Sequence, residues 1–491
     1  MKTFVYLFTS LICIIFLTFC SSENKPSQKR NVLFIGVDDL RPELNCYGKS
    51  QIKSPNIDRL AESGITFTRA YCNVPVCGAS RASLLTGIRP TYNRFLQYYA
   101  QADIETPNAV TLPEQFKNNG YKTISIGKIF HTPADNEEKA WSETPYRIDH
   151  HKMPDGSWSD KGWQNYVTDE NMEILKTNEN GFAWPWENAD VDDAVYDDGK
   201  YAAKAIEYLR EFKQSGEPFF LGVGFLKPHL PFNAPKKYWD LYDREEIDLA
   251  DNPYLPKNAP DQARFNWGEL RAYYGIPGKG PVNDSIAKTL VHGYHACVSA
   301  TDALIGAVLD ELNRLGLREN TIVMLWGDHG WNLGEHGFWC KHVNFETSLR
   351  STLLISDPRY SSGKADGIVE FVDLYPTLVE LCALPNPTQQ LEGVSLAAIL
   401  KDPNERVKDF AIAKWMKGVT LVGDRYFYTE WHNNEKSNTG RMLYDHSVDP
   451  DENVNISEVP ENEAMVNELS TKLNQNLAED YWAPGVGEYQ P

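Results

Sequence analysis

Short apolar segments alternate with helical patterns over most of this chain, and this alternation limits what it can fold into. Four segments are apolar almost throughout, covering residues 31–37, 121–126, 218–225 and 321–326. Segments of this length and composition are typical of strands buried on both faces of a sheet. Leucine and valine recur with helical spacing over 304–315, and Ser54-Pro55 predicts another helix that ends at Gly64. The pattern predicts an α/β domain in which helices flank a large sheet.

A polar cluster follows each of the four predicted strands. These clusters are Asp38-Asp39, Gly127-Lys128, Lys227-Pro228-His229 and Asp328-His329. In open α/β sheets the ligand site lies beyond the carboxyl ends of the strands. We therefore expect the clusters to meet at one edge of the sheet. Taken singly, each has a plainer explanation, since an Asp pair can cap a turn and a lone lysine is usually solvated.

The pattern changes after about residue 395. Short strand candidates then follow one another at 411–415, 419–422, 425–431 and 442–445. Val466, Leu469, Leu473 and Leu477 form one stripe of a closing helix that would cover this small antiparallel sheet. We predict a catalytic domain over 31–395 and a C-terminal subdomain over 396–491.

The N-terminal twenty residues resemble an export signal. Lys2 precedes an apolar run from about residue 4 to 19, which is too short to span a membrane comfortably. Leu17-Thr18-Phe19-Cys20 resembles a bacterial lipobox, in which the cysteine receives a lipid. We expect a signal peptide over 1–20, a tether over 21–30 and a lipid anchor in the bacterial envelope, in the periplasm or at the cell surface. Simple cleavage without lipidation stays open.

Charge and cysteine content exclude several partners and sites. The formal net charge of -20 disfavours nucleic acid, because the summed field repels polyanions. An anionic substrate then requires cations concentrated at one site. Apart from the signal region and Cys77, an odd number of cysteines remains, with no CxxC pair, so neither a disulfide framework nor a zinc site is indicated.

One motif ties these features to a chemistry. Cys77-Gly78-Ala79-Ser80-Arg81, followed by Leu84-Leu85-Thr86-Gly87, resembles the motif of the formylglycine-dependent (type I) sulfatases. The resemblance runs from Asn31 to about Ile456 and includes Gly127-Lys128-Ile129-Phe130-His131 and Gly327-Asp328-His329-Gly330. Lys128-Ile129-Phe130-His131, the Asp328-His329 pair and Tyr428-Thr429-Glu430-Trp431 are most similar to the iduronate-2-sulfatase-like branch. The family resemblance implies an alkaline-phosphatase-like fold, with a large mixed sheet and a smaller C-terminal α+β subdomain of antiparallel strands.

The resemblance also implies roles for single residues. Cys77, oxidised to formylglycine (3-oxoalanine), would be the nucleophile. One Ca²⁺ would be held by Asp38, Asp39, Cys77, Asp328 and His329, although the imidazole departs from the oxygen ligands that Ca²⁺ prefers. Arg81 would orient the nucleophile and Asp328 would deprotonate it. Lys128 and Lys341 would hold the sulfate. His229 would protonate the leaving oxygen, and His131 would take a proton as sulfate departs.

These expectations define a function and its alternatives. The chain would hydrolyse sulfate esters of a uronic-acid-containing polysaccharide or its oligosaccharides, of glycosaminoglycan or algal ulvan type. Ala79 lacks the proline ring of a Cys-x-Pro-x-Arg motif, which favours a radical-type maturase as partner. A phosphodiesterase or phosphonate hydrolase of the same superfamily and a non-catalytic glycan-binding lipoprotein stay open, whereas a zinc phosphatase is disfavoured. His336, Trp339 and Glu346 are further candidates for the substrate pocket.

Overall fold

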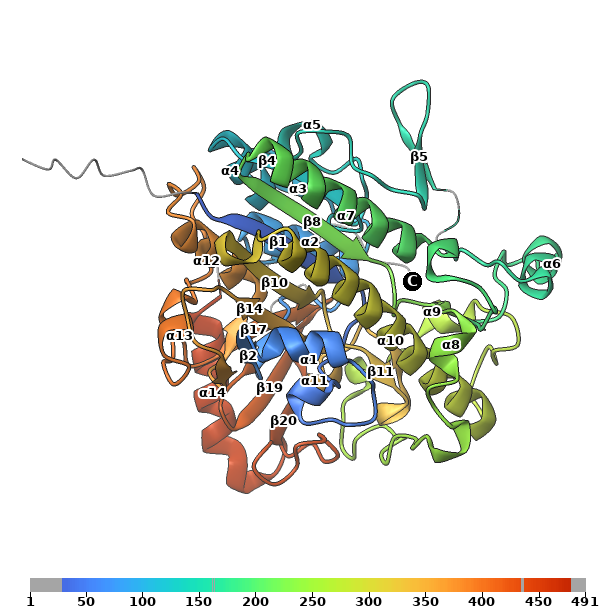
Figure 1. Cartoon of the computed structure of the whole chain (residues 1–491). Coiled ribbons are helices and arrows are strands. Elements are labelled where there is room, and N and C mark those ends of the chain that lie inside the picture. The colour runs from blue at the N-terminus through green and yellow to red at the C-terminus, as the bar shows by residue number, and fades with distance from the viewer. Residues whose placement is uncertain (1–28, 161, 163, 434–436, 478–491) are drawn as a thin grey trace, which may run out of the picture.

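The computed structural model describes residues 29–160, 162, 164–433 and 437–477 (Figure 1). The predicted signal peptide, most of the predicted tether and the last residues of the predicted C-terminal subdomain lie outside the described residues. Among those residues, no helix combines the length and the hydrophobicity that a membrane span requires.

A sheet with the strand order β15-β2-β14-β10-β1-β8-β4 forms the centre of the molecule. Its strands are β1 (Asn31–Val37), β2 (Ile65–Phe67), β4 (Lys122–Gly127), β8 (Phe219–Phe225), β10 (Thr321–Gly327), β14 (Leu353–Ser356) and β15 (Gly363–Ala365). β10, β1, β8 and β4 are parallel neighbours, and β14 runs antiparallel to β10 and to β2. The sheet is therefore mixed, as predicted.

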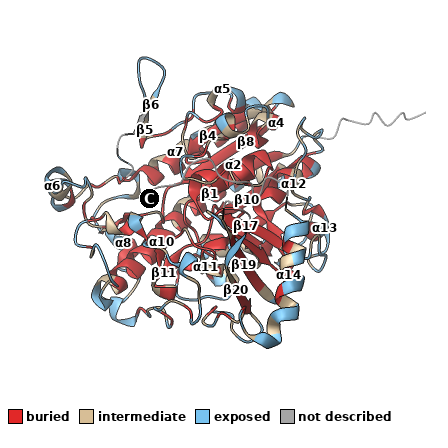
Figure 2. Cartoon of the chain, turned by 180° about the vertical axis from the view of Figure 1, so that it is seen from behind, coloured by how far each residue is buried: buried red, intermediate tan, exposed pale blue. Residues whose placement is uncertain are grey.

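Helices cover both faces of this sheet. α7 (Asp197–Ser215) and α10 (Asp284–Arg314) pack against each other over one face, where α7 also contacts β4 and β8 (Figure 1). Seen from behind in Figure 2, α2 (Cys77–Thr86), α4 (Leu112–Asn118) and α12 (Leu374–Leu381) lie over the other face. The buried residues gather on the strands between these two layers (Figure 2).

The predicted strands agree with β1, β4, β8 and β10 to within one residue at each end. The prediction for α1 (Pro55–Ala61) was less accurate, because the helix ends before Gly64 and the Ser54 side chain accepts no capping hydrogen bond. Asp302 of α10 accepts hydrogen bonds from the N–H groups of Asn56 and Ile57 instead. The cap is thus tertiary and has no local sequence signal.

A second sheet follows residue 410, with the order β17-β18-β19-β20. Its strands are β17 (Ala411–Trp415), β18 (Gly418–Val422), β19 (Tyr426–His432) and β20 (Asn438–Asp445). Alternate residues face opposite sides: Ala411 and Ala413 join the main core, and Ile412 packs under α14 (Glu463–Gln475) with Val466 and Leu473. The predicted helix therefore covers this antiparallel sheet.

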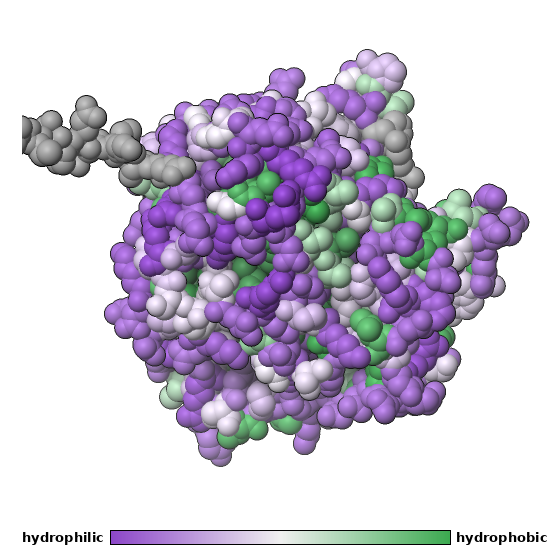
Figure 3. Space-filling view, viewed as in Figure 1, coloured by the Kyte–Doolittle hydropathy of each residue, from purple (hydrophilic) through white to green (hydrophobic). Residues whose placement is uncertain are grey.

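The remaining elements are short. The strands are β3 (Ala70–Tyr71), β5 (His150–Lys152), β6 (Trp158–Asp160), β7 (Trp186–Glu187), β9 (Phe232–Asn233), β11 (Asn332–Leu333), β12 (Trp339–Cys340), β13 (Arg350–Ser351) and β16 (Val369–Glu370). The helices are α3 (Ala102–Glu105), α5 (Glu137–Ala140), α6 (Asp169–Thr177), α8 (Lys236–Trp239), α9 (Gly268–Arg271), α11 (Glu346–Leu349) and α13 (Ala397–Lys401). The face in Figure 3 is mostly hydrophilic, in keeping with the acidic composition.

Candidate active site

The four polar clusters meet at one edge of the central sheet. β1 lies between β10 and β8, with Val37 paired to Gly327 on one side and to Phe225 on the other, and Gly127 of β4 pairs with Gly224. Because these strands are parallel, the residues that follow them emerge at the same edge. Asp38, Asp328, Lys128 and the loop after β8 are thereby neighbours, as the sequence predicted.

Cys77 is the first residue of α2 and points into this edge. It is 2 % exposed, and its Sγ lies 3.3 Å from His329 Nε2. The next residue must be glycine, because a Cβ on Gly78 would lie 1.8 Å from the carbonyl oxygen of Tyr98. Burial and the Asp38 carboxylate raise the pKa of the Cys77 thiol well above its usual value.

Arg81 lies one helical turn after Cys77 and joins the strand ends. Its Nε donates to Asp328 Oδ2 (2.9 Å), its Nη2 lies 3.1 Å from Asp38 Oδ1, and its Nη1 donates to the Ile129 carbonyl (3.1 Å). The guanidinium is almost wholly buried. A planar five-donor group is suited to fix several carboxylate and carbonyl oxygens at once, so Arg81 holds the site in place.

Three aspartates bring their oxygens together beneath Cys77. Oxygens of Asp38, Asp39 and Asp328 lie within 4.8 Å of one another, and all three residues are fully buried. Asp39 has the left-handed φ of 61°, and its N–H donates to Asp328 Oδ1 (3.0 Å). Among the described groups, no donor reaches Asp39 Oδ1.

The charges of these aspartates are unequally compensated. Although burial acts to raise the pKa of Asp38, Lys128 and Arg81 lower it well below its usual value. For Asp39, burial raises the pKa well above its usual value, and the Asp38 carboxylate adds to that rise. Crowded buried carboxylates of this kind are stabilised by a bound cation.

His329 completes this cluster with a nitrogen. Its Nδ1 lies 2.9 Å from the Gly330 carbonyl, which can only accept, so Nδ1 carries the hydrogen. In the neutral ring the lone pair of Nε2 then faces Cys77 Sγ and Asp39 Oδ1, at 3.3 Å and 3.5 Å. A backbone acceptor on the far nitrogen is the usual arrangement of a ligating histidine.

Two lysines line the cluster. Lys128 Nζ lies 2.5 Å from Asp38 Oδ2, and Lys341 Nζ lies 3.3 Å from Asp39 Oδ2 and 4.7 Å from the ring centroid of Trp331. Both ammonium groups are largely buried. They concentrate positive charge at one point of a protein that is acidic elsewhere.

The two predicted proton-transfer histidines are also present, and both are partly exposed. Nδ1 of His229 lies 2.6 Å from the Leu230 carbonyl, and its Nε2 lies 3.2 Å from Glu269 Oε1. The ring of His131 meets that of exposed Tyr98 edge-on at 6.1 Å. Burial lowers the pKa of both histidines well below the usual value, and nearby lysine ammonium groups lower it further.

Two of the further pocket candidates have contacts elsewhere. His336 packs against the ring of Phe345 at 4.5 Å, and Glu346 lies 3.6 Å from Arg350. Neither contact involves the cluster around Cys77, so the place of His336 and Glu346 in a substrate pocket stays a prediction, as does that of Trp339. The sequence did not single out Glu269 and Trp331, which contact His229 and Lys341, because they belong to no motif.

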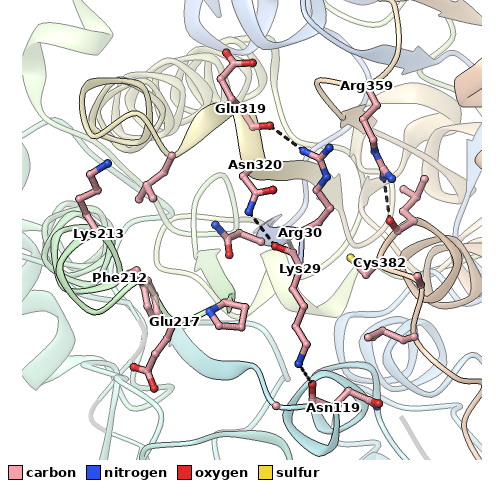
Figure 4. Close-up of a pocket in the computed structure, with 18 of the residues that line it drawn as sticks. Lys29, Arg30, Asn119, Phe212, Lys213, Glu217, Glu319, Asn320, Arg359 and Cys382 are labelled. Carbon is pink, nitrogen blue, oxygen red and sulfur yellow. Dashed lines mark hydrogen bonds between the residues drawn. The ribbon is translucent and has the colours of Figure 1, made fainter. Parts of the chain in front are cut away.

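A large surface pocket of about 1310 Å³ lies at the opposite edge of the sheet (Figure 4). Its lining includes residues just before β1, β4, β8 and β10. Two of its cations bind backbone carbonyls: Lys29 Nζ donates to the Asn119 carbonyl (2.6 Å) and Arg30 Nη1 to the Glu319 carbonyl (2.9 Å). The titratable cluster around Cys77, and not this pocket, is therefore the candidate active site.

Comparisons with known proteins agree with this arrangement. The family model described as Sulfatase matches residues 30–383, and one described as N-sulphoglucosamine sulphohydrolase, C-terminal, matches 334–479. Iduronate 2-sulfatase of Mus musculus is 34% identical over 402 residues, 74% of this chain and 70% of that enzyme. A sulfatase of Formosa agariphila is 33% identical over 475 residues, 93% of this chain and 88% of that protein.

More distant proteins share the fold. An ulvan-active sulfatase of Formosa agariphila is 28% identical over 501 residues, 96% of this chain and 85% of that protein. A protein solved in complex with its substrate D-glucosamine-2-N,6-O-disulfate has a TM-score of 0.72 at 20% identity, covering 91% of this chain and 97% of that one. The phosphonate monoester hydrolase of Agrobacterium radiobacter also has a TM-score of 0.72, at 19% identity, covering 92% and 96%.

The fold alone therefore does not separate sulfate from phosphonate chemistry. The family model and the two relatives at 33% and 34% identity separate the two chemistries, because the model describes sulfatases and both relatives are sulfatases. The chain belongs to the sulfatase family, whose members hydrolyse sulfate esters.

Proposed function

We propose that this sulfatase uses formylglycine at position 77 and acts on sulfate esters of uronic-acid-containing saccharides, of glycosaminoglycan or ulvan type. Relatives that act on iduronate 2-sulfate and on ulvan support this substrate class. The exposed rings of Tyr98 and Tyr99, whose loop packs on Gly78, support a sugar as the group bound beside the nucleophile.

The surroundings of Cys77 are the observation that carries the proposal. A reactive cysteine needs a lowered pKa, but burial and Asp38 raise the pKa of this thiol well above its usual value. With no cation in the cluster, the unmodified thiol is thus a poor nucleophile, although it lies at the centre of the cluster. A formylglycine at this position would supply a hydrated aldehyde as the attacking group.

The residues present also fit a divalent cation. Asp38, Asp39, Asp328 and the Nε2 of His329 would hold it, and Asp39 Oδ1 has no other partner among the described groups. The cation would withdraw charge from the sulfate oxygens and from the nucleophile. Three carboxylates favour Ca²⁺ over softer metals.

The remaining residues would bind sulfate and move protons. Lys128 and Lys341 would hold the sulfonyl oxygens, and Arg81 would keep Asp38 and Asp328 in register with Cys77. Asp328 would take a proton from the attacking group. His229 Nε2 would donate one to the leaving sugar oxygen, and His131 would accept a proton as sulfate leaves.

We further propose that the chain is exported and anchored by a lipid on Cys20, after maturation of Cys77 by a radical-type maturase in the cytoplasm. The lipobox-like Leu17-Thr18-Phe19-Cys20 and the alanine at position 79 support this route. The division into a catalytic domain over 31–395 and a subdomain over 396–491 is part of the same proposal.

Substrate turnover tests the function. Wild-type protein should release sulfate from 2-O-sulfated uronate disaccharides or from ulvan oligosaccharides, and should hydrolyse an aryl sulfate faster than an aryl phosphate diester. Faster turnover of the phosphate diester would favour the phosphonate hydrolase alternative. No release of sulfate from any sulfated saccharide would contradict the proposal.

A further inference from the structure

Glu269 lies between His229 and Lys341, which in the proposed function act on opposite ends of the sulfate ester. Its Oε1 is 3.2 Å from Nε2 of His229, on the side of the leaving oxygen. Its Oε2 is 3.0 Å from Nζ of Lys341, on the side of the sulfate. The Glu269 side chain is 19% exposed, so it is oriented within the site yet remains open to a ligand.

The segment that carries Glu269 is firmly held. Trp267, just before α9, has the left-handed φ of 41°, and the guanidinium of Arg271 lies 3.3 Å from its ring centroid. Arg271 also donates to the carbonyls of Asn266 (2.8 Å) and Pro277 (2.6 Å). These contacts fix the turn, so the carboxylate of Glu269 is placed in the pocket and is not a solvated surface group.

One oxygen of this carboxylate is available to a substrate. Oε1 is buried and accepts no hydrogen bond among the described groups, because its neighbour at 3.2 Å, Nε2 of His229, carries no hydrogen while the ring is neutral. His229 donates through Nδ1 to the Leu230 carbonyl, at 2.6 Å, so its Nε2 is the nitrogen left for the leaving oxygen. A carboxylate is acceptor-only, and the ligand group that suits Oε1 is therefore a hydroxyl.

We propose that Glu269 accepts a hydrogen bond from the free hydroxyl next to the sulfated carbon of the sugar, an inference that rests on the proposed function. With the ester oxygen at His229 Nε2, the oxygen on the adjacent carbon lies about one hydrogen-bond length away, and Oε1 is 3.2 Å from that same nitrogen. Glu269 thus selects an ester flanked by a free hydroxyl. A second sulfate on the adjacent carbon would meet a like charge and be rejected.

A cycle of enzyme and substrate changes tests this proposal. Wild-type protein and Glu269→Ala are compared on a sulfated uronate glycoside with a free hydroxyl beside the ester, on its deoxy analogue and on an aryl sulfate. Removing either the carboxylate or the hydroxyl should lower kcat/KM between about 10-fold and 100-fold, the range for a hydrogen bond to a charged group. Removing the second after the first should change it less than about 3-fold. The loss that Glu269→Ala causes on the parent glycoside should also exceed the loss it causes on the aryl sulfate, which has no such hydroxyl, by about 10-fold or more.

Asp261→Asn serves as the matched control, since Asp261 is an exposed carboxylate of the same connection that pairs with Arg264; it should leave all three rates unchanged. Equal losses in Glu269→Ala on all three substrates, or no loss on the parent glycoside, would overturn the inference while leaving the proposed function standing. A wild-type protein that releases no sulfate at all would overturn the proposed function and the inference together.

Discussion

Some residues of the site belong to sequence motifs and were predictable from them, and others belong to no motif. Cys77 and Arg81 are four positions apart on α2, so helical geometry alone places both on one face. Asp38 and Asp328 follow apolar strands that any pattern analysis finds. Glu269 has no such signal, because its position depends on the backbone of Trp267 and on contacts of Arg271 that only the folded chain provides.

At residue 77 the first prediction concerns mass. The tryptic peptide 70–81 contains Cys72 as well as Cys77. Co-expression with a radical maturase should lower its mass by about 18 Da through conversion of thiol to aldehyde. Fragment spectra should assign the change to Cys77, with Cys72 as the internal control. Efficient conversion by the oxygen-dependent enzyme alone would show that Ala79 does not select the maturase.

The second prediction concerns the metal. Chelation, or combined Asp38→Ala and Asp39→Ala, should remove sulfatase activity, because the cation would lose ligands that are fully buried. Ca²⁺ should restore the chelated enzyme better than Zn²⁺, since the cluster is mainly oxygen. Circular dichroism controls for unfolding. Preferential rescue by Zn²⁺ would give the His329 nitrogen the larger part and refute the Ca²⁺ assignment.

Among the elements, long strands were predictable and short ones were not. β1, β4, β8 and β10 are apolar runs of six or seven residues bounded by polar groups, whereas β2 and β15 have three residues each. Such short segments are recognised only by their partners in the folded sheet, where β2 pairs with β14 on one side and with β15 on the other. The cap of α1 was likewise unpredictable, since Asp302 reaches it from a helix far away in sequence.

The loop after β8, which carries His229, is held by α7. Asp198 accepts hydrogen bonds from the N–H groups of Leu226 (2.8 Å) and Lys227 (2.9 Å), and burial raises its pKa to about 7. The unfolded carboxyl has an ordinary pKa near 3.8. The folded state therefore binds the proton more tightly, and the stability this contributes below pH 4 is lost as pH rises through 7.

The third prediction uses Asp198→Asn, which should remove that part of the pH dependence. The loss of unfolding free energy between pH 5 and pH 8, measured by thermal denaturation, should be smaller in the variant than in the wild type. The difference should be on the order of 1.4 kcal/mol for each pH unit between 5 and the folded pKa of about 7. Asp193→Asn, a change at a partly exposed carboxylate beside Lys237, is the control. Equal pH dependence in wild type and Asp198→Asn would refute the assignment.

In the whole molecule, the fold class followed from the alternation of elements, and the strand order did not. The order β15-β2-β14-β10-β1-β8-β4 joins strands hundreds of residues apart, and no local pattern encodes such pairings. The C-terminal sheet was predicted as a unit covered by a helix. Its other face packs on the main core through Ala411 and Ala413. Small side chains at alternate positions allow this contact but do not predict it.

The fourth prediction concerns the size of the substrate. Lys128, His131, His229 and Lys341 are buried or partly buried around one point, so the pocket should enclose a single sulfated residue at a chain end. Sulfate release should be faster from short oligosaccharides, such as those left by a lyase, than from intact polymer at equal ester concentration. Equal rates on intact high-mass polymer would contradict a chain-end enzyme.

The central claim is that a modified Cys77 is the nucleophile, and the most direct measurement is sulfate release by Cys77→Ala compared with fully matured wild type. The variant removes only the side chain that carries the reaction and should keep the circular dichroism spectrum and thermal midpoint. Its rate should fall below a thousandth of the wild-type rate, because covalent catalysis should supply at least about 4 kcal/mol. A folded Cys77→Ala protein that retains more than a thousandth of that rate would contradict it.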